Sequence, residues 1–384
     1  MAALGAGGAG ADDGVDTRPL TAGDRGFEER HGDEIIVCGR PYRIGTRVVL
    51  WTDEGGYDAY RTSRRFVPFE RSDWKSTLAE MRAGALTFAA AETQETSPDR
   101  YDLRFGSSVG TTFTPEQLEL VRGGGWPLPL LQEKIDQFVL HYDVCGTSAQ
   151  CFYILHDVRG LSVHFLLDVD GTIYQTLDLK ERARHATKSN DRSIGVEIAN
   201  VGAYPVGTDN PFEKWYAADG SGARLIFPPG VRGRERFAGK VVRPRRSEPV
   251  TGTIRGTEYV QYDYTPEQYA ALEKLAAALC DIFPRLRPEI PRGADGRVLT
   301  RTLNAEEWAT FAGILGHYHV QPNKGDPGPA LDWDHLLDGV KQQLQEIRRR
   351  HPHRRHVTPA DSSLDRPDSS HRDRPGARFV PPRG

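Results

Sequence analysis

The chain has 384 residues, of which 38% are hydrophobic, and its formal net charge at pH 7 is −3. This length suffices for two or three domains, and the composition is that of a globular protein with a core. No stretch approaches the run of about 18 apolar residues that a membrane span requires, and the small net charge carries no message about partners.

The first 130 residues divide into two parts. Residues 1–30 are rich in Gly, Ala and Asp, and we expect them to be disordered. Residues 31–130 form an accessory segment, in which 33–69 has short apolar runs between Gly and Pro, as is typical of a small β unit. A helix is predicted over 72–86, and Thr114 with Gln117 indicates another helix start.

The expected main domain covers 131–347. Residues 136–142 predict a buried strand, and 148–157 have helical spacing. Two apolar runs flank Asp170 and Gly171, a pair that suits the positive φ angles of a hairpin turn. Residues 193–200 predict another short strand, and 203–258, rich in Gly, Pro and Arg, predict an insertion of loops and short strands.

The clearest helix begins at Thr265. Thr265 is an N-cap residue, Pro266 suits the first helical position, and Gln268 completes a capping box. One face is apolar as far as Pro284, through Tyr269, Leu272, Leu275, Leu279 and Ile282.

Two more helices and a tail follow. One helix starts at Asn304 with Glu307, and the last runs over 333–347. Residues 348–384 contain ten Arg and four Asp and almost no aromatic residues, so we expect a disordered tail and no nucleic-acid partner. Strands and helices in this mixed order predict an α/β (α+β) fold, with a central mixed β-sheet flanked by helices and a small N-terminal β-rich segment.

Two distant fragments carry candidate metal ligands. His141 lies near the end of the apolar run FVLHYD, and His317, Lys324 and Asp326 lie in the Gly/Pro-rich segment GHYHVQPNKGDPGP. Two imidazoles and a carboxylate suit an open, catalytic Zn²⁺ site, because three protein ligands leave a fourth position for water.

Four blocks in order carry a family resemblance: FVLHYD, RGLSVHFLLDVDGTIYQ, ARHATKSNDRSIGVEIAN and GHYHVQPNKGDPGPALDW. Together they resemble the zinc-dependent N-acetylmuramoyl-L-alanine amidases of the amidase-2 type, a superfamily that includes peptidoglycan recognition proteins. The resemblance covers about residues 134–347. It implies Zn²⁺ held by His141, His317 and Asp326, and hydrolysis of the amide between N-acetylmuramic acid and L-alanine in peptidoglycan or muropeptide fragments.

The resemblance places the catalytic carboxylate at Glu197, inside an apolar strand. A carboxylate there costs free energy unless it has a partner or a role. Burial near the metal would raise its pKa toward the range of a general base, and Lys324 would stabilise the oxyanion. The alternative for Glu197 is a buried ion pair with Arg or Lys.

Other histidines are also candidates. His185 matches a residue of the substrate cleft in many relatives, so we expect it to bind substrate, with a structural histidine as the alternative. Arg184 replaces a Trp of those relatives, which removes an aromatic face for stacking on a sugar. His319 competes with His317 as the ligand, although the position directly after Gly316 matches the family.

Two features of the sequence point to different cellular compartments. The N-terminus lacks a basic region followed by an apolar run, so we expect no signal peptide and a cytoplasmic protein. Cys145 and Cys151 are spaced as in secreted recognition proteins, and they could form a disulfide or remain reduced.

Three functions compete. The first is a zinc amidase acting on peptidoglycan, and the second is a recognition module that grips muropeptides without cutting them. The third is a cytoplasmic amidase acting on anhydro-muropeptides. We expect a monomer with no membrane span in each case.

Overall fold

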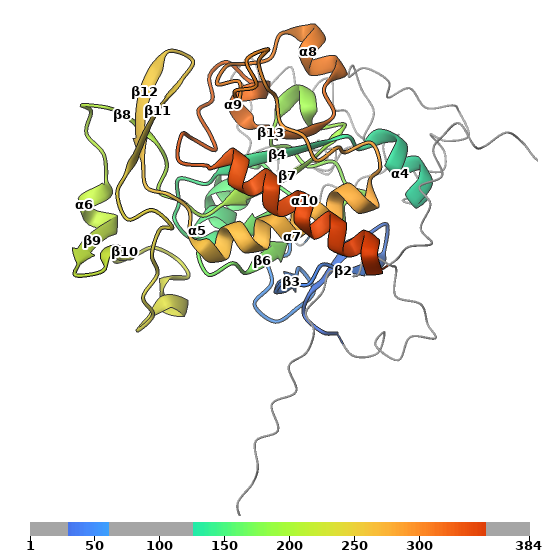
Figure 1. Cartoon of the computed structure of the whole chain (residues 1–384). Helices are drawn as coiled ribbons and strands as arrows, with labels where there is room; N and C mark the ends of the chain where they lie inside the picture. Colours follow the sequence, from blue (N-terminus) through green and yellow to red (C-terminus); the bar gives the residue numbers. More distant parts are fainter. Residues whose placement is uncertain (1–29, 61–125, 351–384) are drawn as a thin grey trace, which may run out of the picture.

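The computed structural model describes residues 30–60 and 126–350 (Figure 1). The helix predicted over 72–86 and the helix start at Thr114 lie outside the described residues. Within the described part, no helix is both long and apolar enough to cross a membrane.

A six-stranded sheet forms the centre of the fold, in the order β13-β4-β7-β5-β6-β3. Only β5 and β6 are antiparallel neighbours, and the other four pairs are parallel. The predicted mixed sheet is therefore confirmed. Its strands are β3 (Val48–Leu50), β4 (Gln137–Tyr142), β5 (Phe165–Leu167), β6 (Ile173–Gln175), β7 (Ser193–Ile198) and β13 (Gly313–Gly316).

The predicted hairpin joins β5 to β6. Asp168 and Thr172 close the turn with a backbone hydrogen bond of 2.9 Å. Gly171 has a φ of +77°, and a Cβ there would lie 2.7 Å from the carbonyl oxygen of Glu267. The turn thus needs glycine both for its backbone angle and for its close approach to Glu267, which lies in the first turn of the helix that begins at Pro266.

Two long helices, α7 (Pro266–Ile282) and α10 (Trp333–Arg350), pack against each other in front of the sheet (Figure 1). The capping box at Thr265 is confirmed, since Thr265 Oγ1 accepts from the Gln268 N–H at 3.0 Å and Gln268 Oε1 accepts from the Thr265 N–H at 2.9 Å. Helix α10 extends beyond its predicted end to Arg350, although its last buried side chain is Ile347.

Shorter helices surround the rest of the sheet: α4 (Leu128–Lys134), α5 (Ser148–Phe152), the π-helical turn η4 (Tyr153–Val158), the 3₁₀ turn η5 (Thr187–Ser189), α8 (Ala305–Thr310) and α9 (His317–Val320). Helix α5 is capped by Thr147, whose side chain accepts from the Gln150 N–H. Helix α8 has the predicted capping box of Asn304 and Glu307.

The N-terminal segment joins the central sheet. β1 (Glu34–Val37) and β2 (Arg40–Arg43) form an antiparallel hairpin, and β3 pairs in parallel with β6. The segment is tied to the loop after β6, because Asp178 accepts from the backbone N–H groups of Cys38 and Gly39. It is therefore part of the same hydrophobic core as α7 and α10.

Residues 203–258 contain short elements beside the sheet, at the left of Figure 1. These are β8 (Tyr204–Pro205), α6 (Phe212–Trp215), β9 (Tyr216–Asp219), β10 (Gly222–Leu225), the 3₁₀ turn η6 (Arg234–Phe237) and β11 (Val250–Ile254), followed by β12 (Thr257–Gln261).

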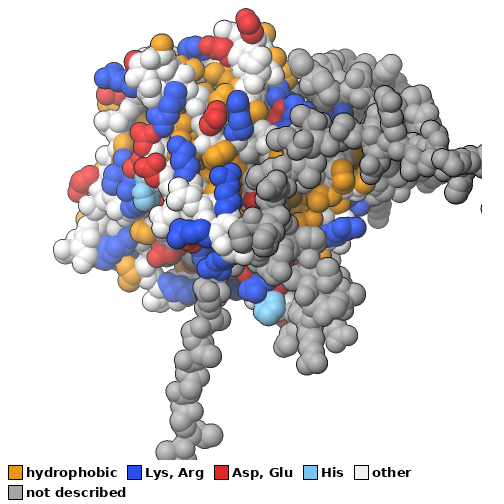
Figure 2. Space-filling view, turned by 45° about the vertical axis from the view of Figure 1, so that its right-hand side comes forward, with side chains coloured by type: hydrophobic (Ala, Val, Ile, Leu, Met, Phe, Trp, Pro, Cys, Tyr) orange, Lys and Arg blue, Asp and Glu red, His pale blue; other side chains and the backbone are white. Residues whose placement is uncertain are grey.

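On the face shown in Figure 2, basic and acidic side chains are interspersed, in keeping with the small net charge.

Candidate active site

His141 reaches the site because side chains alternate along β4. Phe138 and Leu140 belong to the core that α7 and α10 cover, whereas Val139 belongs to a separate cluster on the other side of the sheet. His141 follows the same alternation and projects to the side of Val139. Its side chain is 2% exposed.

His317 and Asp326 come from the segment that follows β13. His317 is the first residue of α9, directly after Gly316 at the end of the strand. A Cβ at Gly316 would lie 2.7 Å from Pro327 Cδ, so glycine permits the returning loop to lie against the strand end. The backbone N–H of Tyr318 donates to the carbonyl oxygen of Asp326 at 3.1 Å, which fixes the loop beside α9.

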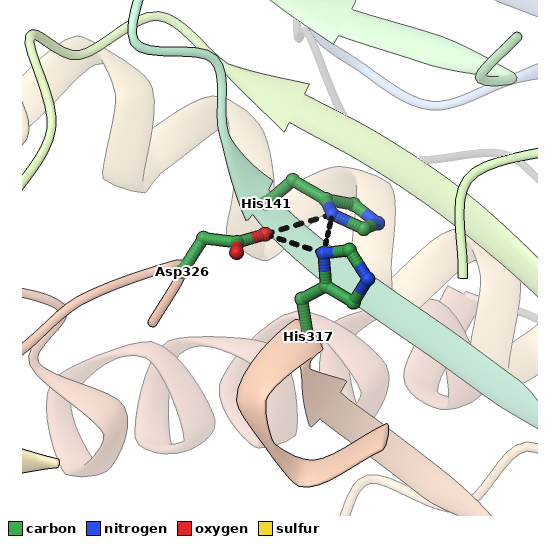
Figure 3. Close-up of side chains that lie close together, drawn as sticks. All are labelled: His141, His317 and Asp326. Carbon is green, nitrogen blue, oxygen red and sulfur yellow. Dashed lines mark hydrogen bonds and ion pairs between the residues drawn. The ribbon is translucent and has the colours of Figure 1, made fainter. Parts of the chain in front are cut away.

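These three side chains converge on one point (Figure 3). Asp326 Oδ2 lies 2.9 Å from His141 Nδ1 and 2.8 Å from His317 Nδ1, and the two Nδ1 atoms are 2.9 Å apart. In a tetrahedral zinc site with bonds of about 2.0–2.1 Å, two ligand atoms are about 3.3 Å apart. The three atoms therefore need to separate by only about 0.5 Å to surround such an ion.

The chemistry of this set also fits a cation. Two ring nitrogens face each other and the same carboxylate oxygen, an arrangement in which all three can offer lone pairs to one ion. Burial, with the neighbouring His317, lowers the pKa of His141 to about 4, which favours the neutral imidazole that binds metals. Burial acts to raise the pKa of Asp326, but His317 and His141 outweigh it and hold that pKa below its usual range.

Glu197 stands beside this point on the neighbouring strand. In the register of β4 and β7 it is the partner of His141, so both side chains project from the same face. Burial, and then the nearby carboxylate of Asp326, raise the pKa of Glu197 well above its usual range. Among the described residues, no side chain forms a hydrogen bond or ion pair with its carboxylate. The buried ion pair considered as an alternative is therefore not seen in this part of the chain.

A cavity of about 280 Å³ opens over the site. His141, His317 and Asp326 line it together with Glu197 and Lys324. The other walls come from the segment after β4, from η4 and from the loop after α9. The structure thus brings all five of these predicted side chains to one cavity.

His185 also lines the cavity, and it contacts His141 directly. Its Nδ1 is 2.9 Å from His141 Nε2, and its Nε2 is 3.2 Å from Ser193 Oγ. Its substrate-binding role stays a prediction.

His319 lies apart from the three converging side chains: its Nδ1 accepts from the Gly316 N–H at 2.9 Å, and its Nε2 is 2.6 Å from the Leu299 carbonyl oxygen. These bonds give His319 a structural role at the start of α9.

Sequence reasoning missed two groups. Gln321 contacts the second candidate ligand, since its Oε1 lies 2.5 Å from His317 Nε2. The spacing of four residues is the signal that could have found it, because residues four apart share a helix face. The second group is Asp143, whose carboxylate lies within 4.8 Å of the Cys145 and Cys151 sulfurs. Both cysteines are free thiols here, and burial raises the pKa of Asp143 to about 7.

The sequence has one family match. Residues 131–227 match the sequence model of the family described as N-acetylmuramoyl-L-alanine amidase. This stretch contains His141, His185 and Glu197 but ends before His317 and Asp326. No curated protein sequence matches the chain.

Several solved structures are similar to the chain. A selenomethionine derivative of AmpD is 19% identical, with 54% of this chain and 86% of that chain covered and a TM-score of 0.28. The endolysin amidase LysCS from Clostridium intestinale is 16% identical over 55% and 86% of the two chains, with a TM-score of 0.29. AmiD from E. coli, solved with anhydro-N-acetylmuramic acid-L-Ala-D-gamma-Glu-L-Lys, is 18% identical over 54% and 57%, with a TM-score of 0.30. At scores below 0.5 these likenesses establish nothing beyond the family match.

Proposed function

We propose that this chain, whose residues 131–227 belong to the N-acetylmuramoyl-L-alanine amidase family, hydrolyses the amide between N-acetylmuramic acid and L-alanine in peptidoglycan or muropeptides. The observation that carries the proposal is the convergence of two Nδ1 atoms and one carboxylate oxygen within 2.9 Å of one another, in a cavity that also holds Glu197.

His141, His317 and Asp326 are the residues that would hold a zinc ion. When bound, such an ion would act as a Lewis acid and would lower the pKa of a water molecule to about 7. Both imidazoles and the carboxylate are buried, so they are shielded from competing bulk water. They present the nitrogen and oxygen donors that Zn²⁺ accepts.

Glu197 is positioned to move the proton. In the proposed reaction its carboxylate accepts a proton from water as the water oxygen bonds to the lactyl carbonyl carbon. It then passes this proton to the nitrogen of L-alanine as the amide C–N bond breaks. Burial raises the pKa of Glu197 from its usual range, which is the direction that suits a group that first accepts this proton and then donates it.

Lys324 supplies a fixed positive charge at the same cavity. It precedes Asp326 by two residues, and no described side chain forms an ion pair with its ammonium group. In the proposed reaction it faces the carbonyl oxygen and stabilises the negative charge that develops there.

Metal analysis combined with mass spectrometry of a digest tests the proposal. Purified protein should contain one zinc per chain, and incubation with peptidoglycan should release stem peptides with a free N-terminal L-alanine. His141→Ala should lose zinc and activity together. Binding of muropeptides without release of peptides would instead identify a recognition module. Comparing intact peptidoglycan with anhydro-muropeptides would decide the preferred substrate and bear on the expected cytoplasmic location.

A further inference from the structure

We propose that His185 and Gln321 are positioning residues that hold the two ligand histidines in the tautomer required for metal binding. This inference rests on the proposed zinc site, and it concerns residues that lie behind the ligands. It gives His185 a role different from the substrate contact that the sequence suggested.

The argument begins with His141. Its Nδ1 faces Asp326 and His317, so this nitrogen must offer a lone pair to the metal, and the ring proton must then sit on Nε2. His141 Nε2 lies 2.9 Å from His185 Nδ1, which makes His185 Nδ1 the acceptor. The proton of His185 is therefore on its own Nε2, from which it donates to Ser193 Oγ at 3.2 Å.

His185 is itself held in place. The side chain of Asn190 accepts from the backbone N–H groups of His185 and Ala186, at 3.1 and 2.7 Å. The ring lies against β7, where a Cβ on Gly195 would come within 2.5 Å of His185 Nδ1. The ring can occupy this place only because residue 195 is glycine.

His317 has the same arrangement with a different partner. Its Nδ1 faces Asp326, and its Nε2 lies 2.5 Å from Gln321 Oε1. The backbone N–H of Gln321 donates to the His317 carbonyl oxygen at 3.0 Å, so the two residues are fixed on adjacent turns. Since the amide oxygen can only accept, it selects the tautomer with the proton on Nε2.

Both ligand rings thus turn Nδ1 inward and donate Nε2–H outward to a neutral acceptor. Removing an acceptor leaves a buried N–H without a partner and lets the ring rotate or change tautomer. Loss of such a supporting hydrogen bond typically lowers metal affinity by about 10- to 100-fold.

Zinc affinity, measured by competition with a chromophoric chelator, tests this without relying on activity. We expect His185→Ala and Gln321→Met to weaken zinc binding by about 10- to 100-fold each. His185→Asn should restore most of the affinity, because its Oδ1 stands near the place of Nδ1, and Gln321→Glu should restore it through Oε1. The matched controls are His335→Ala and Gln342→Met on the exposed side of α10, which should bind zinc as the wild type does.

Melting temperatures show whether each variant is folded. If His185→Ala does not fold, Gln321→Met still tests the inference, because Gln321 is only half-buried and lies at the end of a short helix. Unchanged zinc affinity in Gln321→Met and His185→Ala would overturn the inference. So would a loss in affinity that the Asn and Glu variants do not restore. Raised KM with unchanged zinc affinity in His185→Ala would assign that residue to substrate. Absence of zinc binding by the wild type would instead overturn the proposed function itself.

Discussion

Glu197 illustrates how a single side chain depends on its neighbours in space. Its strand register sets it beside His141, while burial and the charge of Asp326 keep its pKa high. Glu197→Gln removes the proton acceptor and preserves the size of the side chain. We expect this variant to keep its zinc and to lose about 10²–10⁴-fold in turnover. Metal analysis and steady-state kinetics check both parts, and wild-type turnover would exclude Glu197 as the general base.

Lys324 gives a second prediction at this scale. Lys324→Met retains much of the stem and deletes the charge. Because the proposed interaction forms only in the transition state, kcat should fall by about 10²–10³-fold while KM changes little. Kinetics on a soluble muropeptide measure both constants. Weaker binding with an unchanged kcat would show that Lys324 grips a carboxylate of the peptide stem.

Among the elements, α7 has the best-defined start. Thr265 Oγ1 accepts from the Gln268 N–H and also lies 2.8 Å from the Val169 carbonyl oxygen, to which it donates. The cap therefore connects α7 to the turn between β5 and β6. Thr265→Ala should lower the free energy of unfolding by about 1–2 kcal/mol, as measured by urea denaturation.

Asn304→Ala provides the matched control for that prediction. Asn304 forms the same kind of capping box at the start of α8, but on the surface and without a bond to another element. Asn304→Ala should lower the free energy of unfolding by less than Thr265→Ala does. Equal effects would mean that the bond from Thr265 to Val169 contributes little to stability.

At the scale of the whole molecule, the N-terminal segment is part of the main core. Its buried aliphatic side chains lie in the same cluster as Phe138 and Leu140, and they are Ile35, Val37, Ile44, Val48 and Leu50. Full burial of each contributes about 1.5–3 kcal/mol, which together is comparable with the roughly 5–15 kcal/mol stability of a whole protein.

Deletion of residues 1–60 should therefore prevent stable folding, as seen by loss of the cooperative thermal transition. Deletion of 351–384 is the control, because every buried side chain of α10 lies before Arg348. This second truncation should leave the melting temperature unchanged. A folded, zinc-binding protein without residues 1–60 would show that the main domain is stable alone.

The sequence by itself determined the features that local chemistry controls. The capping box at Thr265 and the Asp170-Gly171 turn depend on residues within a few positions of each other, so both could be predicted and both are confirmed. The mixed sheet followed from the order of strands and helices. The candidate ligands could be named because their residue types and the motifs that flank them can be read directly from the sequence.

Only the tertiary structure decided which distant segments meet. Pairing of β3 with β6 joins residues more than a hundred positions apart, and no local pattern in either strand specifies the partner. The contacts of His185 with His141 and of Gln321 with His317 depend on side-chain orientation where β4 and β13 end. Such contacts form only when packing of the whole core offsets the entropy of closing the intervening loops. Their geometry is therefore a property of the folded molecule and not of any one segment.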